Sequence, residues 1–132
     1  MKLHTPKSGT IVAAGGALTG SYVTQGSVQA GQGRDQIVLL VAWTKGDETS
    51  LEVKIQFSDT YAFTVAYNDT VIETSAGVST CYTHEYSMIT ASQNRVIMVS
   101  SEGMYWRIQA KATGGTPTGT IGILYRMDVI QK

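Results

Sequence analysis

Hydrophobic and polar residues alternate with a period of two along much of this chain. The clearest case is residues 50–58, in which Leu51, Val53, Ile55 and Phe57 are separated by polar residues. Successive side chains of a β-strand point to opposite faces, so this pattern predicts a strand with one buried face and one solvated face.

The run that precedes it, residues 36–45, is apolar on both faces and rich in β-branched residues. One face would carry Ile37, Leu39, Val41 and Trp43, and the other Val38, Leu40 and Ala42. The linking residues 45–49 are few and polar and include a glycine, which predicts that the two strands form a β-hairpin.

The last third of the chain repeats the alternation. Strands are predicted over residues 94–100 and 104–112, with a tight turn at 101–103 between them. The Gly- and Pro-containing residues 113–119 predict a loop, and a final strand follows over 120–130.

The rest of the chain gives weaker patterns. Residues 11–14 predict a short strand, and residues 18–30 predict another that is interrupted at Gly26. Residues 61–67 alternate as a strand, whereas residues 77–90 fit a strand, an irregular loop or one short helix.

Together these segments predict an all-β protein with about eight antiparallel strands, a number and spacing typical of a sandwich or barrel. No helical pattern alternates with the strands, which argues against βαβ units. We expect a single-domain β-sandwich over residues 17–132, preceded by an extended N-terminal arm, residues 1–16, that includes the possible short first strand.

Composition supports a folded domain that tolerates close contact with other protein. Of the 132 residues, 42% are hydrophobic and only 15% are charged, against the usual quarter or so, and ten Lys and Arg balance ten Asp and Glu. A neutral surface does not suit nucleic acid, which needs excess positive charge. No apolar run approaches the roughly 18–20 residues of a membrane span, and the glycine-broken residues 11–18 predict mature chain rather than a signal peptide.

Candidate catalytic or metal-binding chemistry is sparse. Cys81 is the single cysteine and lies three residues before His84. These two residues supply at most half of a structural zinc site, and positions three apart on a strand face opposite sides, so we expect a buried thiol beside a surface histidine. Asp47 and Glu48 fall in the predicted turn, where acids are solvated. No glycine pattern matches a phosphate-binding loop, and we expect neither an enzyme nor a cofactor.

Aromatic residues leave one binding alternative open. Seven of them could form a sugar-stacking platform: Tyr22, Tyr61, Tyr67, Tyr82, Tyr86, Tyr105 and Trp106. Trp43 and Trp106 lie on apolar faces and are predicted to be core residues.

The strand that is apolar on both faces points to assembly. In a sandwich one face meets the core, which leaves Val38, Leu40 and Ala42 outside unless the N-terminal arm, the middle segment or another subunit covers them. The interface residues we predict are Leu3, Ile11, Val12, Val38, Leu40 and Ala42.

Two segments resemble small β-sandwich virion proteins of tailed bacteriophages. They are Ile37 to Asp59 and Tyr105 to Gly114, the latter followed by Thr118-Gly119-Thr120. The resemblance covers about a third of the chain and its motifs are structural. It implies a jelly-roll-like sandwich of the head decoration (cement) type, often trimeric, that clamps the shell by bridging capsomers.

Three functional hypotheses follow. The first is a virion structural protein made in the host cytoplasm and placed on the capsid surface, a homo-oligomer with the trimer favoured, whose partner is the major capsid protein or another virion protein. The second is a tail or adsorption component that binds carbohydrate through surface tyrosines. The third is a small hydrolase that uses Cys81 and His84.

Overall fold

The computed structural model describes residues 7–31, 33–83, 85–89, 91–101 and 103–129; of residues 70–75, 80–83, 85 and 89 it describes the backbone alone. These ranges contain eleven strands and no helix. In chain order the strands are β1 (Lys7–Ala17), β2 (Val23–Ala30), β3 (Gln36–Thr44), β4 (Ser50–Ser58), β5 (Tyr67–Asn68), β6 (Thr70–Ser75), β7 (Val78–Thr83), β8 (Glu85–Ile89), β9 (Gln93–Ser100), β10 (Tyr105–Thr113) and β11 (Thr120–Asp128).

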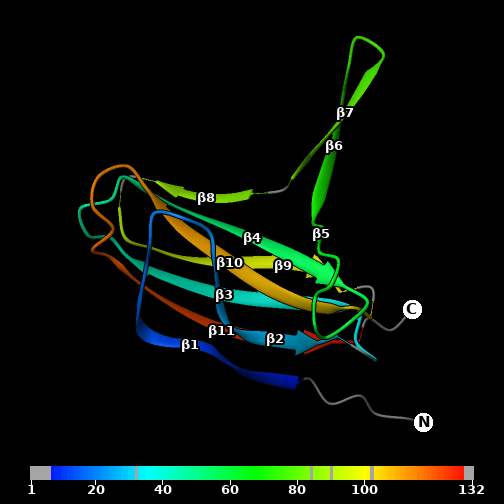
Figure 1. Ribbon diagram of the computed structural model, residues 1–132, viewed down its shortest axis with the longest axis horizontal. Coiled ribbons are helices and arrows are strands. Elements are labelled where there is room, and N and C mark those ends of the chain that lie inside the picture. The colour runs from blue at the N-terminus through cyan, green and yellow to red at the C-terminus, as the bar shows by residue number, and fades with distance from the viewer. Residues whose placement is uncertain (1–6, 32, 84, 90, 102, 130–132) are drawn as a thin grey trace.

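Two antiparallel sheets pack against each other as a β-sandwich (Figure 1). The first sheet has the order β1-β11-β3-β9, and the second has the order β2-β10-β4, with β5 and β8 both pairing with β4. Apart from β5, β6 and β7, the chain crosses between the sheets at every step except from β4 to β8. β1, β3, β9 and β11 therefore lie in the first sheet, and β2, β4, β8 and β10 lie in the second. This is the winding of a jelly roll, so the predicted fold class is confirmed.

The predicted hairpin of residues 36–45 and 50–58 is wrong, although its strands are in place. β3 lies in the first sheet and β4 in the second, and the same holds for β9 and β10. Each short connection therefore crosses the sandwich. A short polar turn with a glycine can join two strands of the same sheet or two strands of facing sheets. Here β3 and β4 lie in facing sheets, and their apolar sides, which include the buried Leu39 and Ile55, pack against each other.

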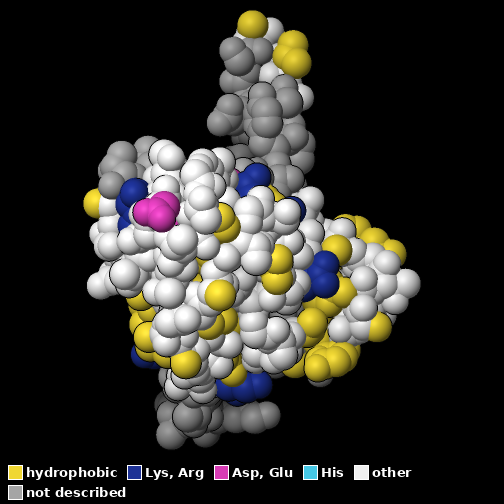
Figure 2. All heavy atoms as spheres, turned by 60° about the vertical axis from the view of Figure 1, so that its left-hand side comes forward, with side chains coloured by type: hydrophobic (Ala, Val, Ile, Leu, Met, Phe, Trp, Pro, Cys, Tyr) yellow, Lys and Arg dark blue, Asp and Glu magenta, His cyan; other side chains and the backbone are white. Residues whose placement is uncertain are grey.

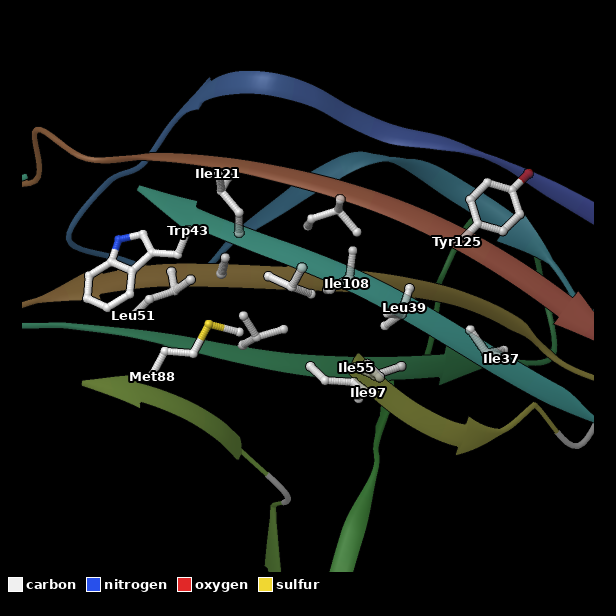
Figure 3. Close-up of a cluster of buried hydrophobic side chains, with 14 of the residues drawn as sticks. Ile37, Leu39, Trp43, Leu51, Ile55, Met88, Ile97, Ile108, Ile121 and Tyr125 are labelled. Atoms are coloured by element: carbon white, nitrogen blue, oxygen red, sulfur yellow. The ribbon is translucent and has the colours of Figure 1, made fainter. Parts of the chain in front are cut away.

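The side chains that alternate along the strands fill the space between the sheets. Figure 3 shows residues of β3, such as Leu39 and Trp43, opposite residues of β4 and β8, such as Ile55 and Met88. Trp43 and Trp106 are buried, as predicted, and each indole N–H has a partner: Glu48 Oε1 at 3.3 Å and Met127 Sδ at 3.3 Å.

The N-terminal part of the chain differs from the prediction. Residues 7–16 belong to the sandwich, because β1 pairs with β11 from Lys7 opposite Met127 to Ala17 opposite Thr120. The sequence predicts only residues 11–14 of this strand, because three of its residues are glycines and its register shifts twice, which breaks the alternation. β2 continues through Gly26, with φ of +64°, by means of a register shift opposite β10.

The middle of the chain forms a separate hairpin. Residues 61–66 are not a strand, and residues 77–90 contribute β7 and β8. β6 and β7 pair only with each other in a two-stranded sheet, closed by Ala76 and Gly77 with φ of +52° and +78°. Two successive positive φ values are those of a type I′ turn. In Figure 1 this hairpin projects from the sandwich on the side away from β1.

Candidate protein-binding surface

The outer side of the first sheet carries an aligned set of apolar residues. The strand register places Leu124 of β11 opposite Leu40 of β3, and Leu40 opposite Val96 of β9. These three side chains are 48%, 45% and 59% exposed. Thr10 of β1 continues the row opposite Leu124.

The rows on either side extend the same surface. One contains Val38 opposite Met98, which is 60% exposed, and the other contains Ala42 opposite Gly122. We call this surface the apolar face: Val38, Leu40, Ala42, Val96, Met98, Gly122 and Leu124. It spans three strands, and Arg126 of β11, opposite Val38, borders it.

A groove of about 590 Å³ is hollowed into the apolar face. It forms because Ala42 and Gly122 are small and lie beside the larger row of Leu40 and Leu124. β1 forms one wall, since Ala14 approaches so closely that a Cβ on Gly122 would lie 3.2 Å from its Cα. Arg95 also lines the groove, but its Nη1–H donates to the Ser87 carbonyl of β8 in the other sheet at 2.6 Å.

The outer side of the second sheet carries polar side chains that form hydrogen bonds and an ion pair with one another. The Nε–H of Arg107 donates to Gln56 Oε1 at 2.9 Å, and Gln56 Nε2–H donates to Asn68 Oδ1 at 2.9 Å. Nearby, Lys111 Nζ lies 3.3 Å from Glu52 Oε2. The two outer surfaces of the sandwich therefore differ in kind, since one is suited to solvent and the other exposes apolar side chains.

The predicted interface residues are partly brought together. Val38, Leu40 and Ala42 lie on the apolar face, with Leu40 and Ala42 exposed and Val38 half-buried. Ile11 and Val12 are half-buried against the chain's own core, although Val12 also lines the groove. Leu3 lies outside the described residues.

Sequence reasoning missed Val96, Met98 and Leu124. The pattern that predicted Val38 and Leu40 is an apolar run without alternation, and residues 96–99 show it too. Because successive side chains of a strand point to opposite faces, these four residues cannot all face the protein core. Leu124 follows Ile123 in the same way. What the sequence could not give was the pairing of β3 with β9 and β11, which joins distant segments into one surface.

Glu48 corrects the expectation of a solvated turn. Its side chain is 0% exposed, and its carboxylate accepts hydrogen bonds from the Trp43 indole, the Gly46 N–H at 3.2 Å and the Gly119 N–H at 3.1 Å. Burial raises the pKa of Glu48, but the backbone N–H groups and the indole outweigh it and hold that pKa below its ordinary value. This Glu48 cluster ties the β3–β4 turn to the β10–β11 loop; it is enclosed and structural.

The candidate chemistry of Cys81 and His84 lies outside what is described, since only the backbone of Cys81 and nothing of His84 is placed. Among the described residues, no group of three or more His, Cys, Asp and Glu side chains is arranged to hold a metal ion. Within the same ranges, no helix is long and apolar enough to cross a membrane.

Among the described residues, the predicted aromatic platform loses Trp106, which is buried. Tyr61 and Tyr67 are 63% and 54% exposed, and Tyr61 contacts Tyr105 edge to face with ring centroids 5.9 Å apart. Tyr22 is half-buried with Lys54 Nζ 4.2 Å from its ring centroid. Tyr86 is half-buried beside Asp69; burial, followed by the Asp69 charge and hydrogen bond, raises the pKa of Tyr86 to about 12. The side chain of Tyr82 is not described.

Comparison with known proteins adds no relative. The sequence matches no family model and no curated protein. What the chain does is therefore inferred from its fold and its surface.

Proposed function

We propose that this chain is a non-enzymatic structural protein of a bacteriophage virion, most simply a capsid decoration (cement) protein that stabilises the head through protein–protein contacts. In this role it is made in the host cytoplasm and lies on the capsid surface as a homo-oligomer, with the trimer favoured, against the major capsid protein. The observation that carries the proposal is the apolar face. The phage assignment itself rests on the sequence resemblance.

The contrast between the two outer surfaces supports an assembly role. A chain with zero net charge and an uncovered apolar surface across three strands has little to keep it apart from other proteins. The jelly roll is compatible with this role, because viral capsid proteins use it, but lectins and cupins use it as well. The fold alone therefore does not select the function.

The size of the apolar face indicates how it would be used. Leu40, Val96, Met98 and Leu124 are each 45–60% exposed, so complete burial of one contributes about 1 kcal/mol and of all four about 4 kcal/mol. A complex with a micromolar Kd has a binding free energy of about 8 kcal/mol, and its contacts must in addition offset the entropy that the two partners lose on association. The face therefore requires a second contact or many linked copies, and a repeating capsid lattice supplies the latter.

A binding experiment with viral heads tests the proposal. The purified chain is mixed with heads of the phage whose genome encodes it, and co-sedimentation is measured against concentration. We expect saturable, stoichiometric binding that Val96→Glu weakens, because it places a charge on the apolar face. Val65→Glu is the matched control, since Val65 is 51% exposed in the β4–β5 loop, away from that face. Heads that bind none of the chain would exclude decoration.

Exposed Tyr61 and Tyr67 favour one other candidate, a tail or adsorption component that binds carbohydrate. Aromatic rings stack on sugar faces, and Asn68 lies beside Tyr67 in the chain as a polar partner. A glycan panel tests it: binding that is lost in Tyr61→Ala and kept in Val96→Glu would replace the decoration proposal. The absence of any bound glycan would remove this candidate.

A further inference from the structure

Arg107 is held in one orientation on the outer side of the second sheet. Its Nε–H donates to Gln56 Oε1 at 2.9 Å, and its Cζ lies 4.4 Å from the centroid of the Phe63 ring. Gln56 faces Arg107 across β4 and β10, and its Nε2–H donates to Asn68 Oδ1 in turn. One edge and one face of the guanidinium are therefore fixed before any ligand arrives, which lowers the entropy that binding would cost.

The positive charge of Arg107 has no acidic partner among the described residues. The ion pairs of those residues do not include it, and neither Nη1 nor Nη2 has a described hydrogen-bond partner. The neighbouring lysines differ, because Lys111 is opposite Glu52 and Lys54 is opposite Glu85, whereas Arg107 is opposite a neutral glutamine. In the space-filling view basic side chains appear at several places on the sandwich and acidic ones in a single small patch (Figure 2). Arg107 therefore presents a half-buried guanidinium with which the anionic group of a ligand can pair.

Aromatic rings of the loop between β4 and β5 flank this guanidinium. Tyr61 packs edge to face on Tyr105 of β10, with ring centroids 5.9 Å apart, and remains 63% exposed. Tyr105 and Arg107 are two positions apart on β10, so they share its outer face. Phe63 lies against Arg107 itself. An exposed ring beside amide groups and a cation suits a sugar, because the ring packs on the C–H face of the sugar and the polar groups bond its substituents.

The backbone of this loop is strained at the residue that contacts Arg107. Phe63 has φ of +53°, and its N–H donates to the Thr60 carbonyl at 3.2 Å. A bulky residue adopts this left-handed conformation only where the surrounding contacts enforce it, and such residues cluster at ligand-binding positions. Here the strained turn keeps the Phe63 ring on the guanidinium.

We infer that Arg107, Phe63 and Tyr61 form a binding site for a sugar that carries a carboxylate. The two carboxylate oxygens pair with the Nη1–H and Nη2–H groups of Arg107, and the sugar ring packs against Tyr61. Gln56 and Asn68 supply amide groups beside it for the hydroxyls. A neutral sugar leaves the guanidinium unpaired and binds more weakly. The inference rests on the carbohydrate candidate of the proposed function and names the class of sugar that this candidate binds.

Titration calorimetry of the purified chain against matched glycans tests this site. The acidic set consists of oligosaccharides that contain sialic or uronic acids, and each has a counterpart in which the carboxylate is a methyl ester. We expect the wild type to bind an acidic glycan about tenfold or more tighter than its ester, and Arg107→Gln or Tyr61→Ala to weaken that binding to a similar extent. Tyr67→Ala is the matched control and should bind as the wild type does. Tyr67 is also exposed, but it pairs with Phe57, whose side chain faces the core.

Arg107→Lys covers the case in which Arg107→Gln does not fold, because it keeps the charge and loses the planar pair of donors. Circular dichroism checks the fold of each variant. Equal binding of acid and ester, or binding of the acid that is unchanged in a folded Arg107 variant, would overturn the carboxylate site and leave the carbohydrate candidate standing. Failure of every glycan to bind would overturn both, and binding of poly-glutamate without any glycan would assign the site to a protein partner instead. The apolar face plays no part in these measurements, so co-sedimentation with heads decides the decoration proposal separately.

Discussion

Replacement of Glu48 by Ala should cost much of the stability of this domain. The change removes the acceptor of the Trp43 indole and of the Gly46 and Gly119 N–H groups, at a side chain that is 0% exposed. Hydrogen bonds to a charged group contribute about 1.5–3 kcal/mol each, and buried donors left without a partner cost about as much. Allowing for relaxation and entry of water, we expect a loss of about 3–5 kcal/mol out of a typical total of 5–15 kcal/mol.

Urea unfolding, followed by tryptophan fluorescence and circular dichroism, measures this loss. Asp47→Ala is the matched control: it removes the neighbouring carboxylate, which is exposed, and should change the free energy of unfolding by less than about 0.5 kcal/mol. If Glu48→Ala unfolded within about 1 kcal/mol of the wild type, the carboxylate would not hold the two loops together, and this reasoning would be refuted.

The pH dependence gives a second test of the same cluster. The pKa of Glu48 is lower in the folded state than in the unfolded state. Its contribution is therefore complete above the unfolded value of about 4.5 and is lost as the pH falls through the folded value. Glu48→Gln should flatten the acid limb of the stability profile, and an unchanged acid limb would argue against an ionised, bonded Glu48.

Further predictions concern neighbouring leucines, a glycine and a tyrosine. Leu39→Ala, at 0% exposure, should lower the free energy of unfolding by about 2–5 kcal/mol, whereas Leu40→Ala, one residue along on the apolar face, should cost less than about 1 kcal/mol; equal losses in urea unfolding would contradict the assignment of the two faces. Gly119→Ala places a Cβ against the Glu48 carboxylate and should destabilise by about 1–3 kcal/mol, a cost that a thermal melt should find reduced when Glu48 is also Ala. Tyr86, with a pKa of about 12, should contribute stability that is lost as the pH rises from about 10 through 12, and ultraviolet titration of Tyr86→Phe should lack one tyrosine that ionises near pH 12 in the wild type.

The alternation of residues is what makes most of this fold predictable. β4 and β10 have one buried and one polar face, and their bounds agree with the predicted segments to within two residues. The buried side chains of both follow directly from the period of two. β3 was predicted from its run of apolar, β-branched residues. The period of two then assigned its side chains to one buried face and one outer face.

Sheet membership could not be predicted, because it depends on contacts between distant segments. Residues 45–49 look like a hairpin turn, yet Glu48 turns inward to bond Gly119, seventy-one positions away. No local pattern contains that partner. β1 was predicted only over residues 11–14, for a different reason: its register shifts and glycines weaken the periodic signal, and pairing with β11 holds it in place.

The candidate surface was predictable in part. Leu40 was predicted as an interface residue because a strand that is apolar on both faces leaves one apolar face outside the core. In the structure Leu40 lies on the outer, exposed side of β3. Val96 and Leu124 joined it only through strand pairing. The projection of the β6–β7 hairpin had no sequence signal, since residues 70–83 differ from the other strands in position and not in composition.

Sedimentation velocity on a concentration series of the wild-type chain, Val96→Glu and Val65→Glu most directly tests whether the apolar face binds protein. The wild type and Val65→Glu should sediment as a species several times larger than the 14.2 kDa monomer, and Val96→Glu should sediment as a folded monomer. Association of Val96→Glu that equals the wild type would contradict the account, because a charge within a buried apolar surface cannot leave that contact unchanged.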